Sequence, residues 1–224
     1  MGGGATLRAE IGDQVRARLA ARPDLLRIPS AELEVFIARD FLSAKECAGL
    51  CRLIDAKRIP SQLLAPTGDP EFRTSESCNL DPREPIVAQI EAKIAALTGI
   101  DPALGEAIQG QRYAVGQQFK PHHDFFHEDQ PYWADMERTG GQRTWTAMAF
   151  LNAPEEGGET AFPTAGVKVA PRLGNLLIWN NMDGAGLPNP ASLHQGSPVL
   201  AGTKYVITKW HRERPWSSAQ IATY

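Results

Sequence analysis

The stretch FKPHHDFFHED, residues 119–129, holds three of the five histidines of the chain beside an aspartate. In an extended strand, residues i and i+2 project from the same face, so His122 and Asp124 can present an imidazole and a carboxylate to one point. His123 would then face away. A His-x-Asp triplet alone is as compatible with a surface or core polar pair as with a metal site, so the pattern needs a third ligand.

A third candidate ligand, His194, stands seventy residues after Asp124, beyond a loop rich in Gly and Pro. A jelly roll would bring this late strand back alongside the early strand that carries His122. Two imidazoles and one carboxylate on one face of a metal leave three coordination positions open, the arrangement of non-haem Fe(II) oxygenases. The three residues therefore predict a catalytic iron centre, with His123 and His127 as non-ligands.

A cationic anchor for a co-substrate follows in the segment TKYVITKW, residues 203–210. Lys204 and Thr208 share a strand face by their i, i+4 relation, so an ammonium and a hydroxyl can converge on one carboxylate. A lone lysine is ordinarily a solvated surface charge. One that is embedded in a buried strand must pair with an anion, because its desolvation is expensive.

The first half of the chain has helical patterns. Residues 5–26 mix apolar and charged residues at helical spacing, so we expect an amphipathic helix that stops near Pro23 and lies outside the main body. We accordingly divide the chain into residues 1–30, this helix and a linker, and residues 31–224, a catalytic domain. Residues 33–42 have strand character, and further helices are expected over 44–57, after a Ser43/Glu46 capping box, and over 82–97, closed by Gly99.

From Glu106 onward, short β-type runs alternate with Gly, Pro, Asn and Asp punctuation. These runs cover residues 106–116, 143–153, 159–163, 167–170, 174–181 and 203–213. Short strands at such spacing indicate a sandwich, barrel or jelly roll, with the earlier helices packed on one outer face. The expected class is therefore mainly β with flanking helices.

The composition limits which binding partners and which cell compartment are expected. A net charge of -3 and a pI near 6.0 give no reason to expect nucleic acid as a partner. No run of about 18 apolar residues is present to cross a bilayer, so no membrane association is expected. The three cysteines lack the spacing of a zinc site or disulfide scaffold, which favours reduced thiols in the cytoplasm; they are Cys47, Cys51 and Cys78. The oligomeric state is left open.

Residues 33–212 resemble the 2-oxoglutarate- and Fe(II)-dependent dioxygenases, and among them the bacterial-type prolyl 4-hydroxylase-like branch. The resemblance depends on six motifs in order: FLSAKEC, RTSES, RYAVGQQFKPHHDFF, GGQRTWTAMAFLN, EGGETAFP and SLHQGSPVLAGTKYVITKW. It implies a double-stranded β-helix, a jelly roll of two antiparallel sheets. It also implies iron held by His122, Asp124 and His194, and 2-oxoglutarate held at its far carboxylate by Lys204 with help from Tyr113, Thr160 and Thr208.

The implied activity is hydroxylation of a peptidyl residue, proline at C4, with O2 consumed and succinate and CO2 released. Ascorbate is implied as a reductant, and a peptide or protein as the substrate. The family's peptide channel maps onto Glu106, Arg143 and Trp210, with the loop 73–75 closing over it. For Glu106 and Arg143, an exposed charge is an equally good interpretation of the residue type.

Two positions depart from the family pattern, since Phe119 and Phe150 stand where the branch commonly has Tyr. Each replacement removes a hydroxyl that could touch peptide or co-substrate, so two alternatives to a peptide hydroxylase stay open. The first is a hydroxylase of a free amino acid, another small molecule or an alkylated base. The second is a cupin-like module that binds metal without turnover, and it predicts no succinate from the ferrous protein supplied with 2-oxoglutarate and O2.

Overall fold

The computed structural model describes residues 3–217 of the chain. Its α-helices are α1 (Gly3–Ala20), α2 (Ala44–Lys57), α3 (Pro85–Thr98) and α4 (Trp133–Arg138). Its strands are β1 (Leu25–Arg27), β2 (Val35–Ala38), β3 (Ile59–Pro60), β4 (Glu76–Asn79), β5 (Gln109–Tyr113), β6 (Phe119–His122), β7 (Arg143–Phe150), β8 (Glu156–Gly157), β9 (Thr160–Phe162), β10 (Val167–Val169), β11 (Leu176–Asn180), β12 (His194–Gly196), β13 (Val199–Ala201) and β14 (Lys204–Arg212). The mainly β class expected from the sequence is confirmed.

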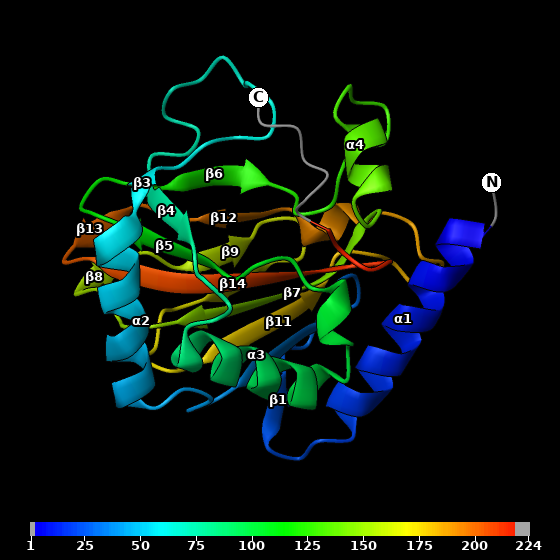
Figure 1. Cartoon of the computed structure of the whole chain (residues 1–224), viewed down its shortest axis with the longest axis horizontal. Helices are drawn as coiled ribbons and strands as arrows, with labels where there is room; N and C mark the ends of the chain where they lie inside the picture. The colour runs from blue at the N-terminus through cyan, green and yellow to red at the C-terminus, as the bar shows by residue number, and fades with distance from the viewer. Residues whose placement is uncertain (1–2, 218–224) are drawn as a thin grey trace.

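Two antiparallel sheets build the body of the molecule (Figure 1). The major sheet has eight strands in the order β1-β2-β11-β7-β14-β5-β4-β3, and the minor sheet has four in the order β10-β9-β12-β6. A separate two-stranded pair joins β13 to β8. Strands distant in sequence are neighbours throughout, as a jelly roll requires.

Alternate side chains of the major sheet enter two different cores. In β7, Trp145 and Ala147 belong to a buried cluster shared with the helices, whereas Met148 and Phe150 belong to a second cluster between the sheets. This is the period of two that a strand buried on both faces must show. The second cluster surrounds the space in which the predicted site residues meet.

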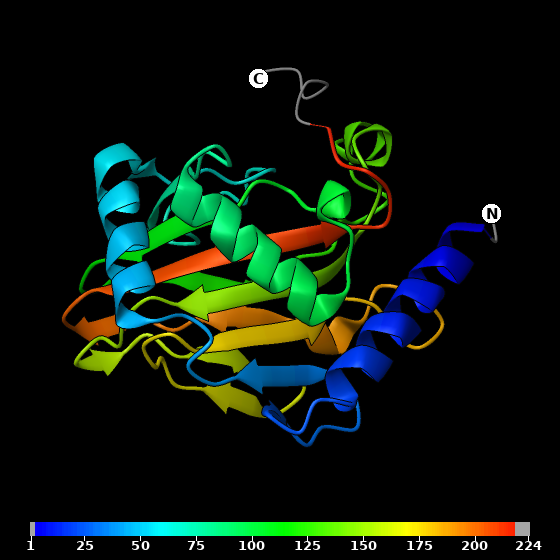
Figure 2. The same ribbon diagram turned by 60° about the horizontal axis from the view of Figure 1, so that its bottom comes forward.

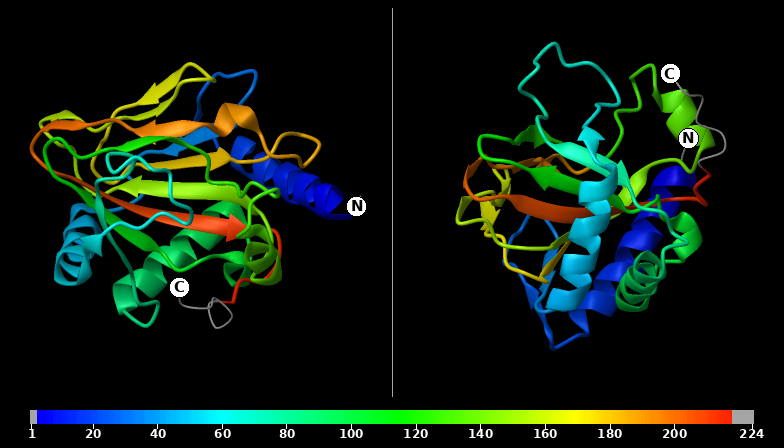
Figure 3. Two further views of the ribbon diagram at one scale, coloured as in Figure 1. Left: turned by 90° about the horizontal axis from the view of Figure 1, so that it is seen from above. Right: turned by 60° about the vertical axis from the view of Figure 1, so that its left-hand side comes forward.

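Helices α2 and α3 cover the outer face of the major sheet, on the side away from the minor sheet (Figures 2 and 3). The start of α2 is set by a capping box, because the Ser43 side chain accepts from the Glu46 N–H while Glu46 bonds back to the Ser43 backbone. The end of α3 is set by Gly99, whose φ of 75° is left-handed. Both boundaries agree with the sequence prediction.

Helix α1 is attached to the body mainly through arginines rather than through a wide apolar face. Val15 and Leu19 enter the outer core. Arg8 donates to the Gly186 carbonyl at 2.7 Å, and Arg18 donates to carbonyls at the end of α3. The helix expected near the start of the chain is thus present and covers the main body.

Strand β1 follows α1 and pairs with β2 in the major sheet, so part of the expected linker lies within that sheet. The division of the chain after residue 30 stays a prediction. Strands β3 and β4 were not expected from the sequence, because β4 reads ESCN and lacks apolar alternation. Within residues 3–217 the structure contains no helix long and apolar enough to cross a membrane.

Candidate active site

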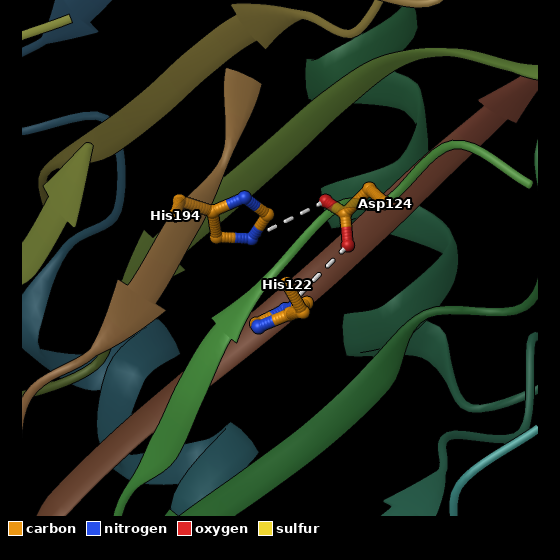
Figure 4. Close-up of side chains that lie close together, drawn as sticks. All are labelled: His122, Asp124 and His194. Carbon is orange, nitrogen blue, oxygen red and sulfur yellow. Dashed lines mark ion pairs between the residues drawn. The ribbon is translucent and has the colours of Figure 1, made fainter. Parts of the chain in front are cut away.

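The three predicted metal ligands meet at one end of the minor sheet (Figure 4). His122 ends β6, His194 begins β12, and the two are directly opposite each other in the antiparallel pairing. His122 Nε2 lies 4.0 Å from Asp124 Oδ1, and His194 Nε2 lies 3.7 Å from Asp124 Oδ2. One ligand atom from each of the three residues lies within 4.8 Å of the other two.

The position of Asp124 differs in one respect from the strand argument. Strand β6 ends at His122, so Asp124 follows in a bend rather than on the same strand face. Its carboxylate is held there by the Thr146 hydroxyl, which donates to Oδ2 at 2.8 Å. Asn181 in turn donates to the Thr146 hydroxyl at 2.9 Å. These two supporting residues were missed, because only the pairing of β7 with its neighbours brings them to the site.

The protonation states of the three groups suit a divalent metal. Nδ1 of His122 donates to the Lys120 carbonyl at 2.8 Å, and Nδ1 of His194 donates to the Ser192 carbonyl at 2.9 Å. Each Nε2 is therefore the nitrogen with a free lone pair, the arrangement usual for metal-ligating histidine. Burial lowers the pKa of His122 to about 3. Burial alone would raise the pKa of Asp124, but the charge of Arg143 and the hydrogen bond from Thr146 favour the carboxylate, and this pKa lies below its ordinary value. Two neutral imidazoles and one carboxylate fit Fe(II).

Aromatic rings fix the orientation of both imidazoles. The Phe119 ring is stacked on His122 with 3.5 Å between centroids, and Trp179 meets His194 edge-on at 4.9 Å. Trp179 belongs to the buried cluster between the sheets and also lines the cavity beside the ligands. The Phe that replaces the family's Tyr thus packs against a ligand instead of offering a hydroxyl.

A cavity between the two sheets adjoins the ligands and contains the predicted anchor, Lys204. Its side chain is buried, with 2% of the residue exposed, and no hydrogen bond or ion pair reaches its ammonium within residues 3–217. The rings of Tyr113 and Phe150 lie 5.1 and 5.7 Å from Nζ. Desolvation lowers the pKa of Lys204 to about 8. A buried cation that has no ion pair is a binding site for the carboxylate of a ligand, which would neutralise its charge.

The other residues predicted to hold 2-oxoglutarate line the same cavity: Tyr113, Thr160 and Thr208. The Thr160 hydroxyl is buried and has no hydrogen-bond partner in the described part of the chain, so it is free to bind a ligand. Gln111, which the sequence reading missed, also lines the cavity and bonds to both Tyr113 and Thr208.

The predicted substrate residues form a cluster at the edge of this cavity. Arg143 binds both oxygens of Glu106, at 2.6 and 2.7 Å, and Arg212 adds a third bond to the same carboxylate at 3.0 Å. The Arg143 guanidinium lies 4.1 Å from the centroid of Trp210, which lines the cavity. Glu106 and Arg143 are therefore a partly buried ion pair next to the cavity rather than two exposed charges.

The remaining histidines lie outside the ligand set. His123 bonds through Nε2 to the Pro190 carbonyl at 3.3 Å, and its ring is stacked on Phe125. His211 is buried, and its Nδ1 lies 3.3 Å from the Trp145 carbonyl.

A double-stranded β-helix with two imidazoles and one carboxylate at its mouth defines the class of non-haem iron oxygenases. In agreement, residues 108–212 match the family described as the 2OG-Fe(II) oxygenase superfamily. The chain is 35% identical over 210 residues to the Arabidopsis thaliana protein named probable prolyl 4-hydroxylase 8, a match covering 83% of this chain and 70% of that protein. It is 38% identical over 152 residues to human prolyl 4-hydroxylase subunit alpha-1, covering 66% of this chain and 28% of the subunit.

Solved structures show the same relationship. The 2OG complex of the viral collagen prolyl hydroxylase vCPH from Paramecium Bursaria Chlorella virus-1 superposes with a TM-score of 0.64 at 29% identity, covering 80% of this chain and 95% of that one. A Pseudomonas putida prolyl-4-hydroxylase shares the fold, with a TM-score of 0.56 at 20% identity, over 89% of this chain and 99% of that one. The chain belongs to the 2OG-Fe(II) oxygenase superfamily, in its prolyl 4-hydroxylase-like branch. Fe(II) and 2-oxoglutarate are accordingly its cofactor and co-substrate.

Proposed function

We propose that this protein hydroxylates a peptidyl proline at C4, with conversion of 2-oxoglutarate and O2 to succinate and CO2. The observation that carries the proposal is the joint presence, in one cavity, of three neutral or anionic ligands and one buried cation without an anion. The names of the related proteins support prolyl residues as the target.

In this proposal His122, Asp124 and His194 hold the iron and leave its other positions to co-substrate and dioxygen. Lys204 binds the far carboxylate of 2-oxoglutarate, and the hydroxyl groups that line the cavity assist it; these belong to Tyr113, Thr160 and Thr208. With its metal and co-substrate bound, the centre supplies an oxidant able to insert oxygen into an unactivated C–H bond. Ascorbate would serve as a reductant that keeps the metal ferrous.

The side chains around the centre orient the reactants and exclude water. Thr146 keeps both carboxylate oxygens of Asp124 aimed at the two imidazoles. The rings of Phe119 and Trp179 shield the imidazoles and prevent them from rotating. No side chain of the site needs to act as a general acid or base, so pH acts on binding rather than on a proton-transfer step.

A peptide is the substrate class that the mouth of the cavity favours. The Arg143 guanidinium lies 4.1 and 4.8 Å from the ring centroids of Trp210 and Phe126, and its two bonds to Glu106 hold it in place. A rigid guanidinium beside an aromatic ring provides donors for backbone carbonyls and a surface for a prolyl ring. The loop between β3 and β4, residues 61–75, projects outward near β6 (Figure 1), and Arg73 within it lies 4.7 Å from the ring centroid of Phe119, which lines the cavity.

The test is succinate release by the ferrous protein with a panel of proline-containing peptides, free proline and an alkylated oligonucleotide. We expect release with a peptide and a gain of one oxygen in its mass, at C4 of proline. His122→Ala should abolish both. Release with free proline alone would replace the peptide by a free amino acid, and no release with or without any substrate would favour a binding module over an enzyme.

A further inference from the structure

Three side chains on one face of β5 form a continuous polar chain, and two of them, Gln111 and Tyr113, line the cavity. Gln109, Gln111 and Tyr113 alternate along the strand and so lie on one face. The Gln111 amide donates to Gln109 Oε1 at 3.1 Å and to the Thr208 hydroxyl at 3.3 Å. Tyr113 donates its hydroxyl hydrogen to Gln111 Oε1 at 2.7 Å. The chain extends outward to Arg73, which donates to Gln109 Oε1 at 2.7 Å.

The direction of every bond in this chain is fixed from its outer end. A guanidinium has only donors, so the atom of Gln109 that it meets must be the amide oxygen. The atom of Gln111 that meets this oxygen must then be the amide nitrogen, and the other end of Gln111 must be its oxygen. An amide flip at either glutamine would place two like groups against each other.

These directions decide which hydroxyl faces the cavity as a donor. Thr208 accepts the Gln111 N–H, and its own hydrogen has no acceptor among residues 3–217, so it is free to donate to a ligand. The Tyr113 hydroxyl has no hydrogen left to donate to a ligand, because it already donates that hydrogen to Gln111.

We propose that Gln111 is a positioning residue for 2-oxoglutarate, which makes Thr208 rather than Tyr113 the hydroxyl donor to the far carboxylate beside Lys204. The proposal rests on the proposed function and refines it, because it divides roles that the resemblance gave equally to the two hydroxyl groups. Through Gln109, the same series of hydrogen bonds links the position of Arg73, in the loop expected to close over the peptide channel, to the affinity for 2-oxoglutarate.

The experiment is anaerobic titration calorimetry of 2-oxoglutarate into Mn2+-loaded protein, which measures Kd without turnover. A hydrogen bond to a carboxylate corresponds to roughly 10- to 100-fold in Kd, so Thr208→Val should weaken binding by about that factor. Gln111→Leu should weaken it similarly, and the double variant should be no weaker than either single one. Tyr113→Phe is expected to weaken binding less than Thr208→Val does.

A matched pair tests the outer link. Arg73→Met should weaken 2-oxoglutarate binding in the wild-type background but not in the Gln111→Leu background. Lys120→Met removes a cation that bonds to Asp69 of the same loop at 2.7 Å without touching either amide, and it should leave Kd unchanged. In turnover, Gln111→Leu should raise KM for 2-oxoglutarate while kcat at saturation is kept, whereas general loosening of the fold would lower kcat and Tm together.

The failure of this inference is distinguishable from that of the proposed function. If the wild-type protein does not bind 2-oxoglutarate, or if Lys204→Met binds it normally, the proposed function fails. If Lys204→Met loses binding but Gln111→Leu keeps the wild-type Kd, the positioning role is wrong and the function stands. Additive losses in Gln111→Leu and Thr208→Val would likewise overturn it.

Discussion

Lys204 places a charge where it has no hydrogen bond or ion pair among residues 3–217, and the charge of Glu159 offsets only part of the cost of burial. The ammonium is buried between two sheets, and its surroundings are the rings of Tyr113 and Phe150 rather than a carboxylate. Burial lowers the pKa of Lys204 from 10.5 to about 8, so the protonated side chain destabilises the ligand-free fold. Residues that bind ligands often lower the stability of the ligand-free protein in this way.

Lys204→Met should therefore stabilise the ligand-free protein while it abolishes 2-oxoglutarate binding. The lowering of the pKa from 10.5 to about 8 corresponds to roughly 3 kcal/mol of unfolding free energy at pH 7. Because the unfolded chain holds the proton more tightly, this penalty is complete below pH 8 and disappears as the pH approaches the unfolded value. Urea unfolding at pH 7 measures the change, and a loss of stability would mean that the ammonium has a partner that stabilises it.

Binding of 2-oxoglutarate should weaken as the pH rises through about 8, since only the protonated Lys204 attracts a carboxylate. Well above that pH, each further unit should cost about tenfold in affinity. Titration calorimetry of the Mn2+-loaded protein between pH 6.5 and 9.5 measures this dependence. Lys204→Arg, which keeps its charge, should bind more weakly at neutral pH but show no such decline. The same decline in Lys204→Arg would assign the titration to another group.

At this scale the sequence predicted the residues that differ most from their surroundings. A histidine pair, an aspartate and a lysine in apolar strands are visible without coordinates, and the structure brings all of them together. Thr146, Asn181 and Gln111 were not visible, because an uncharged polar residue in a strand reads the same whether it supports a ligand or faces solvent. Only strand register reveals their role.

Helix α1 depends on one buried guanidinium for its attachment near the site. Arg8 is 8% exposed, and it bonds to the carbonyl of Gly186 and to two carboxylates, those of Glu128 and Glu213. Arg8→Met should lower the free energy of unfolding by about 3 kcal/mol, because Glu213 stays buried and keeps only its longer ion pair with Arg214, at 3.7 Å. Urea unfolding measures the change.

The control for Arg8 is Arg22→Met, which removes an arginine whose ion pair with Asp24 is exposed. Exposed pairs contribute little to stability, so this variant should unfold close to the wild-type midpoint. Equal losses in the two variants would mean that the network around Arg8 does not hold the helix.

The start of α2 and the end of α3 were the most predictable boundaries, since each is marked by a local rule, whereas α4 was not expected and α3 begins at Pro85 rather than at residue 82. Ser43 with Glu46 and Gly99 act within a few residues of themselves, so no long-range contact could override them. Strands β3 and β4 gave no such signal, because their pairing with β5 supplies the backbone hydrogen bonds that their own sequence does not favour.

The two buried clusters of the whole molecule do not contain the metal ligands, so we expect the fold to form without the metal. The two buried clusters lie on either side of the major sheet, while the ligands come from the end of the minor sheet and the bend after it. The fold class was predictable from the Gly, Pro, Asn and Asp residues that separate the short strands. The order of strands in each sheet was not predictable from the residues alone, since any closed pairing would satisfy the same apolar pattern.

Removal of the metal by a chelator should therefore abolish succinate formation and leave the protein folded. A metal present at about 100 times its Kd adds roughly 3 kcal/mol, so Tm should fall by only about 5–10 °C. Circular dichroism at 25 °C and a thermal scan, each with and without chelator, measure this. Loss of the β spectrum on chelation would show that the metal is a structural staple.

His122 and His194 are direct partners across the pairing of β6 with β12, and β6 is the outermost strand of its sheet. A bound ion would therefore cross-link two neighbouring strands. A shift of β6 by one residue in its pairing with β12 would turn the His122 imidazole to the opposite face of the sheet. The ligand nitrogens that would hold the catalytic metal therefore also fix the register of β6, at the border of the minor sheet. Metal loading should make this border the part of the protein that slows most in amide hydrogen exchange.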